Sequence, residues 1–314
     1  MTSPPAHTPV LLAESLRFLD PRPGGRFIDC TVGLGGHAEA LLTAVGPSGR
    51  LLALDADPDA LERARQRLSG FDDRVALAHS NFEHLLNIAE VQEFQDVDGV
   101  LLDLGVSSLQ FGPSGRGFTI RESEPLDMRM DPTRGPTAAE LLASLPEHEL
   151  ADIIFQYGED RASRRIARSI VYHRDRRPIT TTDDLVGAVI SAVGGQRGRI
   201  HPATRTFQAL RIAVNRELDV LSAALEQATM LLRPGGRLVV ISFHSLEDRI
   251  VKRFLLESAA DDAARPLDIL TRKPITPSEA EISVNPRSRS AKLRAGQRVM
   301  ERDQPRHKEQ VPWP

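Results

Sequence analysis

The sequence predicts an α/β fold, in which a mostly parallel sheet is covered by helices and interrupted by an inserted all-helical domain. Apolar runs of strand length alternate with segments of helical spacing four times between residues 26 and 105. A basic, helix-patterned stretch begins at Thr137, and another strand-like run returns at Arg237. In sheets wound this way, ligands bind outside the carboxyl ends of the strands. The residues at those ends are therefore the first candidates for a functional site.

The first repeating unit is a strand, a glycine-rich turn and a helix. Residues 26–30 form a short apolar run, residues 31–36 are rich in glycine, and helical spacing begins at residue 37. Gly33, Gly35 and Gly36 can adopt positive φ, and the following helix directs its free N–H groups at the turn. Such a unit holds nucleotide-like cofactors, although the same turn also forms for conformational reasons alone.

The second strand ends in an acid that suits a ribose. The apolar run 51–55 ends at Asp55, 22 residues beyond Gly33, where a carboxylate can accept hydrogen bonds from both ribose hydroxyls. The alternative interpretation of Asp55 is the N-cap of the helix that begins at Pro58. Both roles are filled if Asp55 holds the ribose and Asp57 caps the helix.

Two further strands end at candidate ligand-binding residues. Residues 75–82 indicate a third strand with Phe82 just past its end, where the ring would cover an adenine or pack in the core. Residues 97–105 form a nearly continuous apolar run, as a buried parallel strand requires, and this run contains Asp103 near its end. A glycine-rich polar stretch follows, and a long patterned loop beside strand ends is typical of a functional segment.

Helical patterns divide the chain into three parts. We expect the sheet domain to begin in residues 1–111, a loop and the inserted helical domain to occupy 112–206, and the sheet domain to continue in 207–314 with a flexible C-terminal tail. Within the third part, one long helix is expected from Thr206 to Leu232 because apolar residues recur at three- and four-residue spacing. An antiparallel pair near residues 269–271 and 291–298 would close the sheet.

Composition excludes several classes of protein. The 314 residues are 40% hydrophobic and 26% charged, which is ordinary for a globular protein. The single cysteine, Cys30, excludes an internal disulfide framework and suits a reducing cytoplasm. No run approaches the roughly 18 apolar residues of a membrane span, and the N-terminal pattern is not that of a signal peptide. We expect a soluble, cytoplasmic protein with no membrane partner.

Charge is unevenly distributed along the chain. The net charge is −3, yet residues 161–211 contain eleven arginines against three acidic residues, a net charge of +8. Residues 282–298 contain five basic residues and no acidic residue, a net charge of +5. Two basic segments predict a localised face for a polyanion. The alternative is that these helices are solvated faces with many ion pairs.

Longer motifs carry a resemblance to a known family. The glycine turn, the predicted ribose-binding residue Asp55 and the Arg-Pro-Gly-Gly sequence before the fifth strand resemble those of class I (Rossmann-like) S-adenosylmethionine-dependent methyltransferases. Six strings together resemble the RsmH (formerly MraW) family, over about residues 7–293: 7–11, 35–37, 101–108, 125–131, 201–208 and 242–249. That family methylates N4 of a cytidine in the decoding region of bacterial 16S ribosomal RNA.

The resemblance implies a cofactor, a substrate and a set of site residues. S-adenosylmethionine would be bound by Gly35, Gly36, His37, Asp55, Phe82, Asp103 and Gln110. The inserted domain would face the substrate, which is 16S rRNA in the small ribosomal subunit. A homodimer is one of the oligomeric states that the sequence leaves open.

The chemistry of methyl transfer to N4 suggests a catalytic role for an acidic residue at the end of a strand. The exocyclic amine of cytosine is a poor nucleophile because its lone pair is delocalised, so an acceptor aimed at the N4 hydrogens would help. Asp103 is the candidate for this role, although a cofactor contact could occupy it. Candidates on the substrate side are Asp127, Asp131, His201, Arg205, His244 and Glu247. Their alternative role is a structural network that joins the insertion to the sheet.

No catalytic metal is expected, because His201 and His244 lack a tight ligand spacing; a Mg²⁺ ion that assists RNA binding is left open.

Two other classes of function compete with a methyltransferase. Glycine spacing alone does not exclude an NAD-dependent oxidoreductase, because the dinucleotide fingerprint permits Ala38 at its third position. Stabilisation by S-adenosylmethionine or by NAD would separate these two classes. A ribosome assembly factor with a vestigial cofactor pocket is the third possibility.

Overall fold

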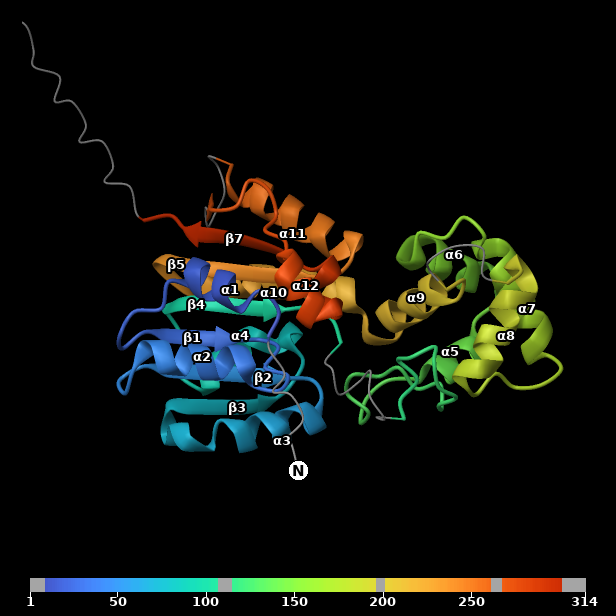
Figure 1. Cartoon of the computed structure of the whole chain (residues 1–314), viewed down its shortest axis with the longest axis horizontal. Helices are drawn as coiled ribbons and strands as arrows, with labels where there is room; N and C mark the ends of the chain where they lie inside the picture. The colour runs from blue at the N-terminus through green and yellow to red at the C-terminus, as the bar shows by residue number, and fades with distance from the viewer. Residues whose placement is uncertain (1–8, 107–114, 196–200, 261–266, 301–314) are drawn as a thin grey trace, which may run out of the picture.

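A computed structural model describes residues 9–106, 115–195, 201–260 and 267–300 (Figure 1). Its centre is a seven-stranded sheet, with strands in the spatial order β3 (Val75–His79), β2 (Arg50–Asp55), β1 (Arg26–Asp29), β4 (Val97–Asp103), β5 (Leu232–Ser242), β7 (Lys292–Arg298) and β6 (Leu267–Ile269). The first five strands are parallel, and β7 runs antiparallel to both β5 and β6. The predicted parallel sheet and its antiparallel closing pair are confirmed.

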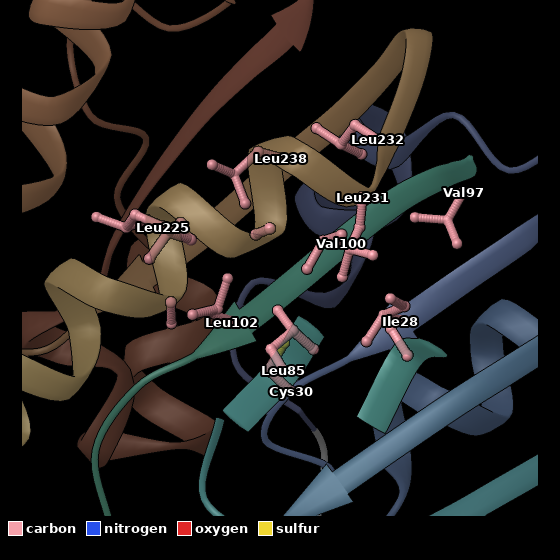
Figure 2. Packing of buried hydrophobic residues seen from close by; sticks show 14 of the residues in the cluster. Ile28, Cys30, Leu85, Val97, Val100, Leu102, Leu225, Leu231, Leu232 and Leu238 are labelled. Atoms are coloured by element: carbon pink, nitrogen blue, oxygen red, sulfur yellow. The ribbon is translucent and has the colours of Figure 1, made fainter. Parts of the chain in front are cut away.

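Helices cover both faces of the sheet because alternate strand residues point in opposite directions. Ile28, Val100 and Leu102 belong to one buried cluster with α4 (Leu85–Val91), α10 (Glu217–Leu231) and α11 (Ser245–Ser258). Figure 2 shows these strand residues beside Leu85 of α4 and Leu225 of α10. The opposite cluster joins other strand residues to α1 (Leu12–Leu19), α2 (Gly36–Val45) and α3 (Pro58–Arg67). Each fully buried leucine or isoleucine contributes roughly 1.5–3 kcal/mol to this sandwich.

The insertion is a helical unit with its own core. It contains α5 (Ala138–Ser144), α6 (Glu147–Gly158), α7 (Ser163–Arg174), α8 (Thr182–Val193) and α9 (Thr204–Asn215). Thr137 and Thr181 begin α5 and α8 with reciprocal capping boxes, which satisfy backbone N–H groups at both helix starts. In Figure 1 this unit lies beyond the carboxyl ends of the parallel strands. The predicted all-helical insertion is therefore present, and it faces the edge where a ligand is expected.

The single long helix expected from Thr206 to Leu232 is wrong. The structure contains two helices, α9 and α10, separated by Arg216, whose φ of 50° is left-handed and ends the helical path. Phe207 and Leu210 of α9 belong to the core of the helical unit. We therefore propose that the insertion extends past the expected boundary at residue 206 and ends at Arg216. The expected C-terminal tail lies outside the described residues from 301 onward.

The segment between β6 and β7 returns to the carboxyl ends of the parallel strands. It contains α12 (Glu279–Val284) and a 3₁₀ turn, η3 (Pro286–Ser290). The Leu11 N–H donates to Glu281 Oε1 at 2.8 Å, which joins α12 to the start of α1. Two other 3₁₀ turns, η1 (Ser69–Arg74) and η2 (Phe82–His84), flank β3. No helix in the described part of the chain is long and apolar enough to cross a membrane.

Candidate cofactor and acceptor site

Asp55 and Asp57 divide the two roles that the sequence left open. Asp57 caps α3, because its Oδ1 accepts the Asp59 N–H at 3.1 Å. Asp55 instead ends β2 and faces the glycine turn: its Oδ2 accepts the Gly33 N–H at 2.8 Å, and its Oδ1 accepts the Asp57 N–H at 2.9 Å. The Asp55 carboxylate therefore holds the turn in place and lines the cavity beside it.

The glycines of the turn serve two different surfaces. Gly33 and Gly35 adopt left-handed φ values of 52° and 78°, which disfavour other residues. A Cβ added at Gly36 would lie 2.3 Å from the Pro9 ring, so this position requires glycine for space. A Cβ on Gly35 would instead lie 3.5 Å from Ala64 of α3. Gly36 lines the cavity, whereas Gly35 packs the turn against α3.

Five of the predicted cofactor residues surround one cavity. It has a volume of about 160 Å³ and lies at the carboxyl ends of β1, β2 and β4. Its lining includes Gly36, His37, Asp55, Phe82 and Asp103. The remaining two predicted residues are Gly35, which packs against α3, and Gln110, which lies outside the described residues. Residues that were predicted from the ends of different strands therefore lie around one cavity.

Buried carboxylates dominate the electrostatics of this edge. Burial raises the pKa of Asp29 to about 7 and that of Asp55 to about 6. Burial, together with the nearby charges of Asp29 and Glu247, raises the pKa of Asp103 well above its ordinary value. Asp103 Oδ1 is buried and has no hydrogen-bond partner among the described residues. An acceptor atom is therefore available at the end of β4.

His37 lies between the start of α1 and Asp103. Its Nε2 is 3.1 Å from the carbonyl oxygen of Val10, and its Nδ1 is 3.6 Å from Asp103 Oδ2. Since a carbonyl oxygen can only accept, Nε2 donates to Val10 and carries the proton of the neutral ring. Nδ1 of that ring is then the atom that faces Asp103. The buried imidazole orients this wall of the cavity.

A second, larger cavity of about 690 Å³ adjoins the first. It is lined by the helical unit, the end of β5 and η3, and its walls include Phe118, Phe207, Phe243 and Arg289. Gly105, Val106, Phe243 and Arg287 line both cavities. A ligand in the second cavity can therefore meet a ligand in the first at these four residues.

A charged network forms the wall where the two cavities meet. Arg211 donates to both oxygens of Glu217, at 2.8 and 2.9 Å. Glu247 is buried and accepts the Phe243 N–H at 2.8 Å, while His244 Nε2 lies 3.1 Å from its other oxygen. The neighbouring His244 and Arg211 help to hold the pKa of Glu247 below its ordinary value, against the effect of burial.

Sequence reasoning named His244 and Glu247 but missed Arg211 and Glu217. Carboxylate and imidazole atoms of Glu217, His244 and Glu247 lie within 4.8 Å of one another, which is close enough for a metal ion. The guanidinium of Arg211 is a bidentate partner of Glu217, so the charge of that carboxylate is already balanced by the protein. Arg211 and Glu217 are six residues apart across the break at Arg216, and only that break would have indicated their pairing.

The other four substrate-side candidates have local partners. Asp127 forms a bidentate ion pair with Arg129, and Asp131 Oδ1 accepts the N–H of Thr133 at 2.9 Å. His201 Nδ1 accepts the Ala203 N–H at 3.2 Å, and Arg205 donates to the carbonyl oxygen of Glu159 at 3.3 Å. Asp127, Asp131, His201 and Arg205 are absent from the lining of the two described cavities. Their contacts favour the structural alternative over direct contact with a ligand.

The fold and the first cavity define the class of this protein. A parallel sheet with a glycine turn, an acid after β2 and an aromatic ring after β3 is an α/β domain that binds a nucleoside cofactor. Residues 5–299 match the family described as the MraW methylase family. The chain therefore belongs to the MraW methylase family. It is a methyltransferase, and its cofactor is S-adenosylmethionine rather than the dinucleotide that glycine spacing left open.

Three relatives named ribosomal RNA small subunit methyltransferase H are similar over nearly their full length. The protein from Thermomicrobium roseum is 50% identical, over 93% of this chain and 94% of the relative. Proteins from Dehalococcoides mccartyi and Heliobacterium mobile are also 50% identical, over 94% and 93% of this chain and 87% and 99% of the relative, respectively.

Proposed function

We propose that this chain transfers a methyl group from S-adenosylmethionine to N4 of a cytidine in the decoding region of 16S rRNA. The observation that carries the proposal is the junction of the two cavities at Gly105, Val106, Phe243 and Arg287. Methyl transfer requires donor and acceptor to be held in line at close range, and adjoining cavities provide that arrangement. The names of the relatives support ribosomal RNA as the acceptor.

The first cavity suits the cofactor chemically. Each Asp55 oxygen accepts one backbone N–H, which leaves further acceptor capacity for ribose hydroxyls. Phe82 offers an apolar ring after β3 for the adenine, and Gly36 lets the backbone approach closely. When bound, S-adenosylmethionine supplies an electrophilic methyl group. The chain itself supplies the position of the cofactor.

Asp103 is the residue that we propose to assist the acceptor. An amine that gains a methyl group must lose a proton, and a carboxylate aimed at N4 can accept it. Asp103 Oδ1 is buried without a partner among the described residues. Asp103 also lies two residues before Gly105, which lines both cavities. General-base assistance of this kind contributes about 10²–10⁴-fold to a rate.

The helical unit supplies a basic surface for RNA. Arg164, Arg165 and Arg168 are exposed on α7, and Tyr172 is 54% exposed with the Arg176 guanidinium 3.4 Å from its ring centroid. An exposed ring and an arginine stack suit unpaired bases and phosphates. In Figure 1, α7 lies at the end of the unit remote from the sheet. A surface so far from the cavities suits a large substrate such as the small subunit.

The test is methyl transfer from labelled S-adenosylmethionine to small subunits that lack this modification, followed by nucleoside analysis. Label in N4-methylcytidine is expected. Label in another nucleoside, or no label on subunits, naked rRNA and assembly intermediates, would contradict the proposed acceptor.

We place the enzyme in the cytoplasm with its ribosomal substrate. A homodimer stays a prediction, and sedimentation of the purified chain would test it.

A further inference from the structure

We propose that η3 is a phosphate clamp, in which Arg287 and Arg289 hold a phosphate of the acceptor nucleotide while its base occupies the second cavity. This inference rests on the proposed function, since it assigns the acceptor to that cavity. It identifies the ligand of the second cavity as a single nucleotide turned out of its helix. Enzymes that modify a base commonly extrude it, because the reacting atom is inaccessible in a stacked pair.

The basic segment 282–298 separates into structural and cavity-lining residues. Lys292 and Arg294 both bind Asp248, at 3.0 and 2.6 Å, and Arg298 donates to the carbonyl oxygen of Leu232. Those three cations therefore hold β7 to α11 and β5. Arg287 and Arg289 are exposed and line the second cavity. The first group is thus placed to join elements of the sheet domain, whereas the second group is placed where a ligand can reach it.

The backbone of η3 is fixed before any ligand binds. Ser288, between the two arginines, is fully buried, and its hydroxyl donates to the Asn285 carbonyl oxygen at 2.8 Å. The Ala291 N–H donates to the Ser288 carbonyl oxygen, also at 2.8 Å. Arg287 and Arg289 therefore leave the backbone on either side of an anchored residue. A fixed backbone reduces the entropy lost when two flexible cations bind one anion.

The lining of the second cavity separates into an apolar part and a cationic part. Phe118, Phe207 and Phe243 contribute rings that suit the faces of a base, while Arg287 and Arg289 contribute the cations of η3. A guanidinium matches the oxygens of a phosphate with two parallel N–H donors. The volume of about 690 Å³ lies in the range of roughly 300–1,000 Å³ that is usual for sites of small organic ligands.

The position of Arg287 also explains how phosphate binding would direct the base towards the first cavity. It lines both cavities, so a phosphate held there lies beside the junction at Phe243 and Gly105. The sugar and base attached to that phosphate are thereby held close to the junction. The clamp would align N4 with the first cavity without any contact to the base itself, and Arg287 and Arg289 act as positioning residues.

The probe is cytidine monophosphate, as the 5′ and the 3′ isomer, compared with cytidine. Calorimetric titration would use the full chain saturated with S-adenosylhomocysteine. One charge-assisted contact to a phosphate is worth roughly a factor of ten or more in affinity. We expect at least one monophosphate to bind about tenfold more tightly than cytidine, and the Arg287→Gln/Arg289→Gln variant to lose that preference. The matched control, Arg272→Gln/Lys273→Gln, removes the same charge from exposed positions outside the described cavity linings and should keep it.

Equal binding of cytidine and both monophosphates to the wild-type chain would overturn the clamp, as would a preference that survives in the double variant. The thermal midpoint reports whether the variant is folded. If it is not, Arg289→Gln alone replaces it, and the same loss of preference is expected. Methyl transfer by the wild-type chain is measured separately. Phosphate preference without transfer to cytidine would retain the nucleotide site and refute the proposed function.

Discussion

Asp29, at the end of β1, shows how the cavity edge affects stability. Its side chain is 1% exposed, Oδ1 accepts the Thr31 N–H at 3.1 Å, and Oδ2 has no hydrogen-bond partner among the described residues. Burial raises its pKa from 3.8 to about 7, so the folded chain retains a proton there that the unfolded chain releases. Stability contributed by this group is therefore full below about pH 4 and is lost as pH rises towards 7.

Replacement of this acid by its neutral isostere should remove that loss. We expect Asp29→Asn to be more stable than the wild-type chain at pH 8, with the difference shrinking as pH falls towards 4. A shift of about three pKa units corresponds to roughly 4 kcal/mol as an upper limit. Urea unfolding of both proteins at several pH values measures the difference. A difference that does not change with pH would show that Asp29 is not the titrating group.

Asp103 should control the rate of methyl transfer. Burial raises the pKa of Asp103, so at a given pH its carboxyl holds a proton more often than an ordinary aspartate does, and a base must first lose that proton. We expect kcat to rise with pH through the Asp103 pKa, and Asp103→Asn to lower kcat by about 10²-fold or more. Single-turnover transfer at saturating S-adenosylmethionine across a pH series is the measurement, with the thermal midpoint as the control for folding. Unchanged kcat in Asp103→Asn would remove it from catalysis.

At the scale of elements, the contact between α6 and α9 requires a residue without a side chain. A Cβ added at Gly158 would lie 2.7 Å from the carbonyl oxygen of Arg205, whereas a Cβ at Gly187 of α8 would meet nothing within 4 Å. We expect Gly158→Ala to lower the free energy of unfolding by about 1–3 kcal/mol because the two helices must separate. Gly187→Ala, the matched control, should raise it by about 0.5–1 kcal/mol through helix propensity. Chemical denaturation of both variants is the measurement, and equal effects would mean that α6 and α9 are not in tight contact.

Elements were predictable from the sequence where one local pattern decides them. The strands were found because a buried parallel strand is a short apolar run, and the acids at their ends meet because parallel strands end at one edge. The break at Arg216 was missed because apolar spacing continues from Val214 to Leu218 and arginine favours helix. That break depends on α9 packing in the helical unit and α10 on the sheet. The second cavity was missed because its walls come from several segments far apart in the chain.

At the scale of the whole molecule, charge separates the two units. The chain has a net charge of −3, while residues 161–211 have a net charge of +8. Arg164 and Arg165 of α7 are exposed and have no ion-pair partner among the described residues, whereas Arg168 lies 3.6 Å from Glu147. The first two arginines are therefore the better probes of a phosphate contact. The basic face and the junction of the cavities lie in different parts of the molecule, so they can be tested apart.

Neutralising α7 should weaken RNA binding without changing the chemistry. We expect Arg164→Gln/Arg165→Gln to bind small subunits less tightly and to lower the slope of log affinity against log salt by up to about 0.9 for each phosphate that the variant no longer binds. The control, Arg63→Gln/Arg65→Gln, removes the same charge from exposed positions of α3 and should leave the slope unchanged. At saturating subunits, kcat of the α7 variant should equal that of the wild-type chain. Equal slopes in both variants would return the basic insertion to a solvated helical face, and a lowered kcat with an unchanged slope would mean that α7 acts on the cavities and not on RNA.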